Sequence, residues 1–250
     1  MKRFGFHIAL MLLMTWVGCN VPAEGPDTIP QTVEARPSLS ELCSQFFTDK
    51  CAIDHNFVEV YANLFDPIRD SVTRVFEIGI LRGASHLMWQ AYFPNADIFG
   101  IDIEDKSDLE AKGIKTFVAD QSNRADLQGF LDKYGTAFDI ILDDGGHAMH
   151  HQQVSFGFLF EQVKPGGYYI IEDVHTSLPQ FYPSKFFNVK EDESNTTLKM
   201  IETYFRTSAV VSEYMLPEEV EYLHRNIEKM ELSYRTTPRH SMVCIIQKKK

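Results

Sequence analysis

Two short segments of the chain carry acidic and imidazole side chains at spacings that could support catalysis or metal binding. They are residues 143–147, which read Asp-Asp-Gly-Gly-His, and residues 172–175, which read Glu-Asp-Val-His. Each follows a short apolar run bounded by turn residues, at 138–142 and 168–171, and such runs predict β-strands. If these strands are parallel neighbours, their carboxyl ends meet at the crevice where open α/β sheets bind ligands.

Four side chains would converge on that crevice: Asp144, His147, Glu172 and Asp173. Carboxylates this close together are costly unless a positive charge lies among them. The cluster therefore predicts a hard divalent cation, a cationic substrate, or both. Asp143 could join the cluster or simply cap the next helix, because strand-end aspartates often do so.

The elements that must position these residues alternate between strand and helix patterns from residue 72 onward. Strands are predicted at 72–78, 97–101, 116–119, 138–142 and 168–171, and helices at 85–92, 124–134, 149–163 and 198–208. This alternation predicts βαβ units and a parallel sheet. Two late β-like runs, 227–234 and 242–247, have no helix between them and should pair antiparallel. We expect an α/β fold: a Rossmann-like, doubly wound, mostly parallel sheet with a C-terminal antiparallel hairpin.

A glycine turn after the first strand predicts a nucleoside site. Gly79 and Gly83 allow a ligand to approach the backbone, but their spacing is not the one that cradles a dinucleotide pyrophosphate. Asp102 ends the second strand, where a carboxylate can accept hydrogen bonds from a ribose diol. Residues 120–122 (Asp-Gln-Ser) follow the third strand and could contact an adenine edge. The set fits a nucleoside without a pyrophosphate and disfavours an NAD-dependent oxidoreductase.

Composition limits the class of protein and its partners. The 250 residues are 44% hydrophobic and 24% charged, which predicts one globular domain with a substantial core plus extensions. The formal net charge of -11 argues against a nucleic-acid partner, since phosphate binding needs a basic face.

The N-terminus has the pattern of a targeting segment. Lys2 and Arg3 precede an apolar run at 4–17, which is followed by Gly18 and Cys19. The run is short for a membrane span, which needs about 20 apolar residues. We expect residues 1–19 to be a signal peptide or a membrane or lipid anchor, with Cys19 as the lipidated residue of a lipoprotein. The protein would then be exported or membrane-associated, and cytoplasmic if the leader is not used.

A proline-containing polar stretch separates the leader from the folded part. Residues 20–38 predict a flexible linker, and residues 39–250 the domain itself. If the chain is exported, a disulfide between Cys43 and Cys51 becomes feasible, whereas in the cytosol both would be reduced.

A resemblance to a known family rests on several motifs that occur in order. Glu77-x-Gly79-x-x-x-Gly83, Asp102, Asp120, Asp143 and residues 164–167 (Lys-Pro-Gly-Gly) resemble class I S-adenosylmethionine-dependent methyltransferases. More narrowly, the chain resembles the metal-dependent sugar O-methyltransferases that act on macrolide antibiotics of the mycinamicin type, and in part related cephalosporin-biosynthesis proteins. The narrower motifs are Thr48-Asp49-Lys50, His55, Gly100-Ile101-Asp102, Asp120-Gln121-Ser122, Asp143-Asp144-Gly145-x-His147, His151-Gln152 and Glu172-Asp173-x-His175-Thr176-Ser177.

The resemblance implies an S-adenosylmethionine- and Mg²⁺-dependent O-methyltransferase acting on a hydroxyl of a sugar or another small hydroxylated molecule. It implies cofactor contacts from Glu77, Gly79, Gly83, Asp102, Asp120, Gln121, Ser122 and Asp143. It implies Mg²⁺ ligation by Asp144, Glu172 and Asp173, with His147 as the catalytic base. The residue types agree, because carboxylates suit a hard cation and imidazole exchanges protons near neutral pH.

Several assignments stay open at this level. His55 could close over the cofactor or be structural, and His175 could line the acceptor site or support a ligand. Residues 176–197 are long for a loop in a compact domain and could form a lid over the acceptor. The rival from another class is a membrane-tethered, non-catalytic binding protein that retains the fold. Assembly into a homo-oligomer is left open as well.

Overall fold

A computed structural model describes residues 36–237 and 239–250. One compact unit comprises Pro37–Lys250. The predicted leader at 1–19 and nearly all of the predicted linker at 20–38 lie outside the described residues. Within the described part, no helix has both the length and the apolar character needed to cross a bilayer.

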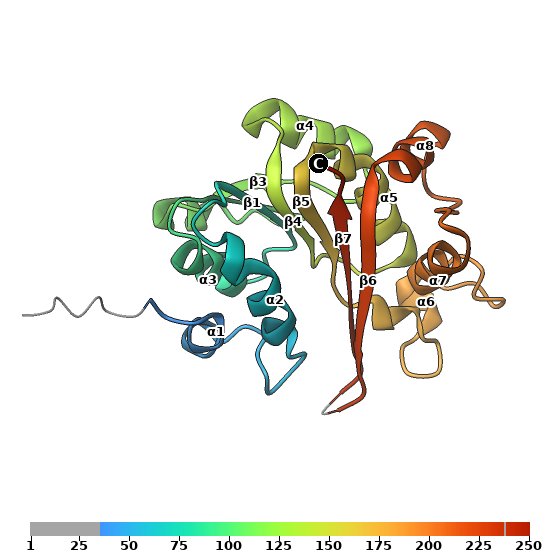
Figure 1. The fold of residues 1–250 in the computed structure, drawn as a ribbon, viewed down its shortest axis with the longest axis horizontal. Coiled ribbons are helices and arrows are strands. Elements are labelled where there is room, and N and C mark those ends of the chain that lie inside the picture. Colours follow the sequence, from blue (N-terminus) through green and yellow to red (C-terminus); the bar gives the residue numbers. More distant parts are fainter. Residues whose placement is uncertain (1–35, 238) are drawn as a thin grey trace, which may run out of the picture. The chain divides into compact units, whose positions relative to one another are not determined.

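The centre of the unit is a seven-stranded sheet in the order β3-β2-β1-β4-β5-β7-β6. The strands are β1 Arg74–Ile78, β2 Asp97–Asp102, β3 Lys115–Val118, β4 Phe138–Asp143, β5 Val163–Ile171, β6 Ile227–Arg235 and β7 Ser241–Lys248. Strands β1 to β5 are parallel, β7 is antiparallel to β5, and β6 is antiparallel to β7. The predicted parallel sheet with a C-terminal antiparallel hairpin is confirmed, and the hairpin forms one edge of the sheet (Figure 1).

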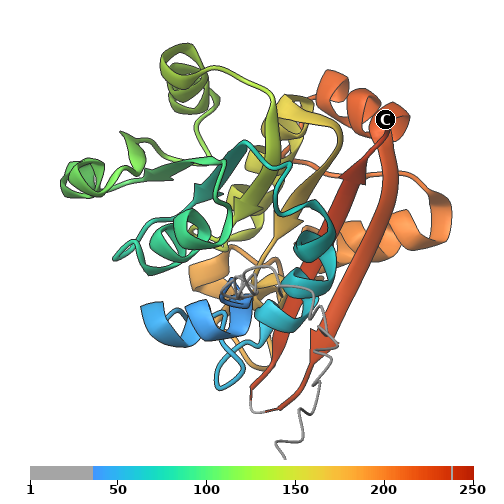
Figure 2. The ribbon, with the colours of Figure 1, turned by 60° about the vertical axis from the view of Figure 1, so that its left-hand side comes forward.

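Helices cover both faces of the sheet, as Figures 1 and 2 show. One apolar core packs against α1 Leu39–Phe46, α2 Phe57–Phe65 and α3 Ala84–Tyr92. The other packs against α4 Arg124–Tyr134, α5 Met149–Leu159, α7 Thr197–Thr207 and α8 Pro217–Asn226. Alternate residues of a strand serve the two cores, since Val75 faces the first and Phe76 the second. The sheet is therefore buried on both sides, as parallel sheets require.

Some boundaries differ from the sequence-based expectation. The helix predicted at 149–163 ends at Leu159 and continues only as a short 3₁₀ turn, Phe160–Gln162. Strand β5 starts at Val163 instead of residue 168, because Val163 pairs with Phe138 before the register shifts. The shift takes up the residues around Pro165, which cannot donate to a ladder. Helices α1, α2 and α8 were not predicted.

Candidate active site

The sheet register brings the two acidic segments together. Asp143 pairs with Ile78 on one side and with Ile171 on the other. One residue further on, the Asp144 N–H donates to the Ile78 carbonyl at 3.0 Å and the Glu172 N–H donates to the Asp143 carbonyl at 3.0 Å. Asp144 and Glu172 thus leave adjacent strands at the same edge of the sheet. The expected convergence of the two segments is present in the structure.

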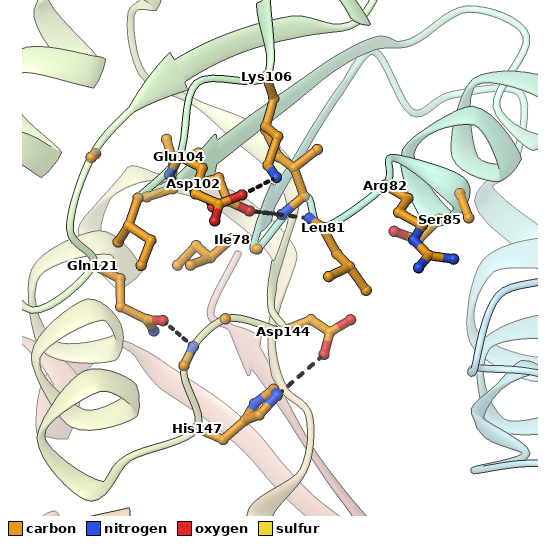
Figure 3. Close-up of a pocket in the computed structure, with 18 of the residues that line it drawn as sticks. Ile78, Leu81, Arg82, Ser85, Asp102, Glu104, Lys106, Gln121, Asp144 and His147 are labelled. Carbon is orange, nitrogen blue, oxygen red and sulfur yellow. Dashed lines mark hydrogen bonds and ion pairs between the residues drawn. The ribbon is translucent and has the colours of Figure 1, made fainter. Parts of the chain in front are cut away.

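A cavity of about 640 Å³ opens at this edge (Figure 3). Among the predicted site residues, its lining includes Gly79, Asp102, Asp120, Gln121, Asp144 and His147. Apolar side chains of Ile78, Leu81 and Ile103 contribute further walls. Within the described chain, the lining does not include Glu77, Gly83, Ser122, Asp143, Glu172 or Asp173. The cofactor contacts expected of the first four of these therefore remain predictions.

Gly79 makes the close packing at the cavity floor feasible. Its φ is +88°, and a Cβ built there would lie 2.2 Å from the Asp144 carbonyl oxygen. Any larger residue would clash with backbone that cannot move aside, besides adopting an unfavourable conformation. The first strand and the loop after β4 meet at this glycine, so a ligand in the cavity would touch the backbone directly.

Asp102 is held rigidly at the end of β2. Its Oδ2 accepts from the N–H groups of Ile80 at 2.9 Å and Leu81 at 3.1 Å, and its Oδ1 accepts from the Glu104 N–H at 3.0 Å. Burial acts to raise the pKa of Asp102, but these backbone donors outweigh it and hold the pKa below its usual value. The carboxylate is thus ionised and fixed facing the glycine turn, as Figure 3 shows.

Gln121 connects the end of β3 to the loop after β4. Its Oε1 accepts from the Gly146 N–H at 2.7 Å, and its Nε2 donates to Asp143 Oδ1 at 2.8 Å. Asp143 is fully buried and also accepts from the hydroxyls of Ser155 and Tyr169. Burial raises the pKa of Asp143 despite these donors. Asp143 supports the cavity wall through Gln121, and it does not cap α5, whose N-cap is Ala148.

Lys50 places a buried ammonium group among the carboxylates. Its Nζ lies 2.9 Å from Glu172 Oε2 and 3.2 Å from Glu77 Oε1, and it donates to Asp144 Oδ2. Burial acts to lower the pKa of Lys50, but the charges of Asp144, Glu172 and Glu77 outweigh it and raise the pKa well above its usual value. The lysine is therefore charged, and one positive charge faces three carboxylates.

The carboxylate of Glu77 belongs to this buried network. It accepts from Ser85 Oγ at 2.9 Å and Trp89 Nε1 at 3.0 Å, both on α3, and it is fully buried. Its contact with Lys50 links the predicted cofactor strand to the predicted metal cluster. Glu77 does not line the cavity, and the cofactor contact expected of it stays a prediction.

Glu172 is also buried, and both of its oxygens have partners. Oε1 accepts from the Tyr61 hydroxyl at 2.7 Å and Oε2 accepts from Lys50. Burial and the nearby charge of Asp144 raise the pKa of Glu172 well above its usual value, while Lys50 acts in the opposite direction. Glu172 therefore holds a proton more readily than an exposed glutamate, and one lysine faces three carboxyl groups here.

Asp144, His147 and Asp173 form the partly exposed side of the cluster. His147 Nε2 lies 3.4 Å from Asp173 Oδ2 and 4.0 Å from Asp144 Oδ1. His147 itself has φ +53°, a conformation uncommon outside glycine that turns its ring toward these carboxylates. Burial raises the pKa of Asp173, and the charge of Asp144 adds to this, although His147 lowers it.

The donors in this group suit a hard divalent cation. One potential ligand atom from each of Asp144, His147 and Asp173 lies within 4.8 Å of the others. Asp173 Oδ1 is buried and has no hydrogen-bond partner among the described residues. Buried polar atoms without partners are rare in folded proteins and call for an explanation. A metal ion bound by the Asp173 carboxylate would provide one.

Two more histidines approach Asp173 from its other side. The Nδ1 atoms of His55 and His175 each lie 3.8 Å from Asp173 Oδ1, and the two rings stack with centroids 5.4 Å apart. Burial lowers the pKa of His175 to about 3, so its ring is neutral, and its Nδ1 accepts from the Met242 N–H at 3.2 Å. His175 thus lies beside Asp173 and is hydrogen-bonded to the C-terminal hairpin.

The segment expected to form an acceptor lid lies beside this group. It begins in a 3₁₀ turn, Val174–Ser177, and contains the short helix α6 Ser184–Phe187. Tyr182 packs on His175 with centroids 5.0 Å apart, and Phe181 stacks on His240 near the hairpin tip at 4.0 Å. Phe186 is 78% exposed. The segment presents aromatic groups next to the carboxylates, and its role as a lid stays a prediction.

A disulfide joins Cys43 of α1 to Cys51, directly after Lys50. The bond closes the turn that carries Phe47, Thr48 and Asp49, all of which line the cavity. The sequence allowed this pairing for an exported chain. In the structure it anchors one wall of the cavity next to the buried lysine.

The strand order of the sheet and the cavity at its carboxyl edge are those of the class I methyltransferase fold. The chain is 40% identical over 149 residues to mycinamicin VI 2''-O-methyltransferase from Micromonospora griseorubida, and 41% identical over 150 residues to demethylmacrocin O-methyltransferase from Streptomyces fradiae. A structure of MycE methyltransferase from the mycinamycin biosynthetic pathway, in complex with Mg, SAH and mycinamycin VI, matches with a TM-score of 0.70 and 31% identity. The resemblance predicted from the motifs is confirmed.

These similarities cover only part of each related protein. Each sequence alignment covers 57% of this chain but only 37% and 38% of the two relatives, and the structural match covers 86% of this chain and 55% of MycE. The part of this chain that aligns thus spans between about a third and just over half of the relatives' own length. No family model matches the chain.

Sequence reasoning assigned no role to Lys50 or Tyr61. Lys50 appeared only as part of the Thr48-Asp49-Lys50 motif, and nothing in its local sequence marks it as buried. A lysine that follows an aspartate in a polar turn is usually solvated. Only the convergence of distant segments identifies it as the countercharge of the cluster.

Proposed function

We propose that this protein is a Mg²⁺- and S-adenosylmethionine-dependent O-methyltransferase that acts on a hydroxyl of a sugar or another small hydroxylated molecule. The observation that carries the proposal is that Asp144 and His147, which are grouped with Asp173, line the same cavity as Gly79, Asp102 and Gln121. Carboxylates for a cation, a base and a nucleoside-sized cavity thus share one edge of the sheet. The similarity to sugar O-methyltransferases supports the same assignment.

The cavity residues would bind and orient the cofactor. Asp102 presents a fixed, ionised carboxylate for the ribose hydroxyls, and Gly79 lets the ligand lie against the backbone. Gln121 keeps the β4–α5 loop in place through Gly146. The methyl group would point toward the carboxylates, and alignment with the acceptor would supply much of the rate acceleration.

Asp144 and Asp173, with Glu172 behind them, would hold the magnesium ion. When bound there, the ion would lower the pKa of an acceptor hydroxyl. His147 would take the hydroxyl proton as the acceptor oxygen bonds to the methyl carbon and the sulfonium C–S bond breaks, leaving S-adenosylhomocysteine. The resulting imidazolium would be stabilised by Asp173, which lies 3.4 Å from Nε2.

Calorimetry with S-adenosylmethionine, in the presence and absence of Mg²⁺, tests this function directly. We expect cofactor binding at tens of micromolar or tighter, and product formation with a panel of glycosides when Mg²⁺ is present. No cofactor binding in that range would refute the assignment. Binding without turnover on any glycoside would instead point to a different hydroxylated acceptor.

A second candidate is a binding protein that retains the fold and lacks turnover, tethered to a membrane through the N-terminus. The Cys43–Cys51 disulfide favours it, because disulfides persist in oxidising compartments, where S-adenosylmethionine is not ordinarily supplied. The leader and the lipidation of Cys19 remain part of this proposal. Fractionation of cells fed labelled fatty acid would decide: lipid on Cys19 together with no cofactor affinity supports the second candidate over the first.

A further inference from the structure

The carboxylate region of the described chain contains three overlapping groups that could each hold a cation: one of His55, Asp173 and His175, and two that share Asp144. The inner group consists of Glu77, Asp144 and Glu172, and the outer group of Asp144, His147 and Asp173. In each group, one ligand atom per residue lies within 4.8 Å of the others. By donor geometry alone, both groups could bind a divalent ion.

The inner group is already filled by Lys50. Its ammonium contacts all three carboxylates of that group and is completely shielded from solvent. An ammonium has three N–H donors, and here it hydrogen-bonds to Asp144 and Glu172 and pairs with Glu77. The three carboxylates thus already share one cation.

The outer group has the exposure that an exchangeable ion needs. The side chains of Asp144, His147 and Asp173 are 17%, 22% and 15% exposed, whereas those of Glu77 and Glu172 are 0% and 2% exposed. A catalytic Mg²⁺ keeps positions for water or substrate oxygens, so it must face the cavity. Asp144 and His147 do line the cavity.

Lys50 is also held in place along its backbone. The Cys43–Cys51 disulfide lies next to it, its N–H donates to Thr48 Oγ1 at 3.2 Å, and its carbonyl accepts from the Val58 N–H in α2 at 3.2 Å. These contacts fix the backbone from which the Lys50 side chain reaches the carboxylates.

We propose that Lys50 is a built-in cation that occupies the inner carboxylate group and directs a single divalent ion to the outer carboxylates, Asp144 and Asp173, beside the base His147. Lys50 is thus a positioning residue, which acts through the carboxylates and does not touch the acceptor. The proposal rests on the proposed function, since it assumes that the wild-type protein binds one divalent ion at this edge of the sheet.

The test is the number of divalent ions bound by Lys50→Met, measured with Mn²⁺ alone. Methionine keeps an unbranched apolar stem and removes the charge. We expect one Mn²⁺ per chain in the wild type and two in the variant, by calorimetry and by electron paramagnetic resonance. The two ions would share Asp144, so their signals should broaden each other. We also expect Mn²⁺ to raise the unfolding temperature more in the variant than in the wild type.

Lys164→Met is the matched control. Lys164 also pairs with a carboxylate, Asp139, but at the opposite end of the sheet. Its removal should lower stability and leave the Mn²⁺ stoichiometry at one. A purely structural role for Lys50 would produce the same pattern in Lys50→Met, with lower stability and one ion of unchanged affinity. That result, or weaker binding of the single ion, would overturn the proposal.

Two further outcomes are distinguishable. If wild-type protein binds no Mn²⁺, the proposed function fails before the role of Lys50 is reached. If Lys50→Met does not fold in metal-free buffer, refolding with Mn²⁺ becomes the measurement. Recovery of folded protein by Mn²⁺ supports the proposal, because the ion then replaces the ammonium, and failure to recover contradicts it.

Discussion

At each end of the parallel sheet a lysine pairs with carboxylate chemistry, but the balance between positive and negative groups differs between the two ends. At the amino end, Asp139 near the start of β4 pairs with Lys164 and also accepts from the backbone N–H groups of Thr73 and Arg74 at 2.8 and 2.9 Å. Burial acts to raise the pKa of Asp139, but these donors outweigh it and hold the pKa below its usual value. One carboxylate meets one lysine and several N–H donors, so its charge is fully compensated.

At the carboxyl end, a single ammonium serves three carboxylates, and Asp173 adds a fourth nearby. The pKa values of Glu172 and Asp173 are raised, chiefly by burial. The amino end is thus an arrangement for stability, while the carboxyl end is left short of positive charge. A divalent ion would supply the missing positive charge. This imbalance of charge distinguishes a candidate active site from a structural ion pair.

The largest expected effect comes from His147 at the carboxyl end. His147→Asn should lower the rate of methyl transfer by about 10²–10⁴-fold, the usual contribution of a general base. The affinities for S-adenosylmethionine and Mg²⁺, measured by calorimetry, should stay close to wild type. His150→Asn, three residues further along, is the control and should keep its activity. Equal loss of cofactor affinity and rate in His147→Asn would remove His147 from the role of base.

Breaking the disulfide should destabilise mainly the carboxyl end of the sheet, because the disulfide lies next to Lys50. Cys43→Ser with Cys51→Ser should lower the free energy of unfolding by about 2–3 kcal/mol, as expected for a short closed loop. Dithiothreitol should have the same effect on the wild-type unfolding temperature and none on the double variant. If dithiothreitol leaves the wild type unchanged, the two cysteines are not paired in solution.

Removing one carboxylate from each end tests the comparison itself. Asp144→Asn should weaken Mg²⁺ binding by at least about 10-fold, because even groups that only support a metal ligand contribute 10–100-fold. Asp139→Asn should leave Mg²⁺ binding unchanged. Titration calorimetry on both variants measures this, and equal effects would show that the two ends do not differ as proposed.

The smallest effect is on stability at the amino end. Asp139→Asn should lower the free energy of unfolding at neutral pH by about 1–2 kcal/mol through lost hydrogen bonds. Because the folded-state pKa of Asp139 lies below that of the unfolded chain, its stabilising contribution is present above the unfolded pKa. It is lost as the pH falls through the folded pKa. Urea unfolding at several pH values should therefore show wild type and variant converging in acid.

Local sequence patterns were sufficient for most of the fold. The alternation of strands and helices, the antiparallel pairing of β6 and β7 and the bounds of α4 follow from residue periodicity and turn residues. Patterns also placed Asp144 and Glu172 at strand ends, which the register then brought together. Helices α1, α2, α6 and α8 were not predicted, and α6 is a single turn of four residues, too short to show a helical repeat in the sequence.

What the sequence by itself determined is therefore the sheet, the edge at which the chemistry is expected and the residue types gathered there. Only the tertiary structure decided which of those residues line the cavity and which are buried away from it. Glu77 and Asp143 are fully buried and do not line the cavity, while Asp144 and His147 do. Lys50 reaches Asp144 and Glu172 from 94 and 122 residues away. Burial and charge pairing at that range depend on how distant segments pack, which no local pattern encodes.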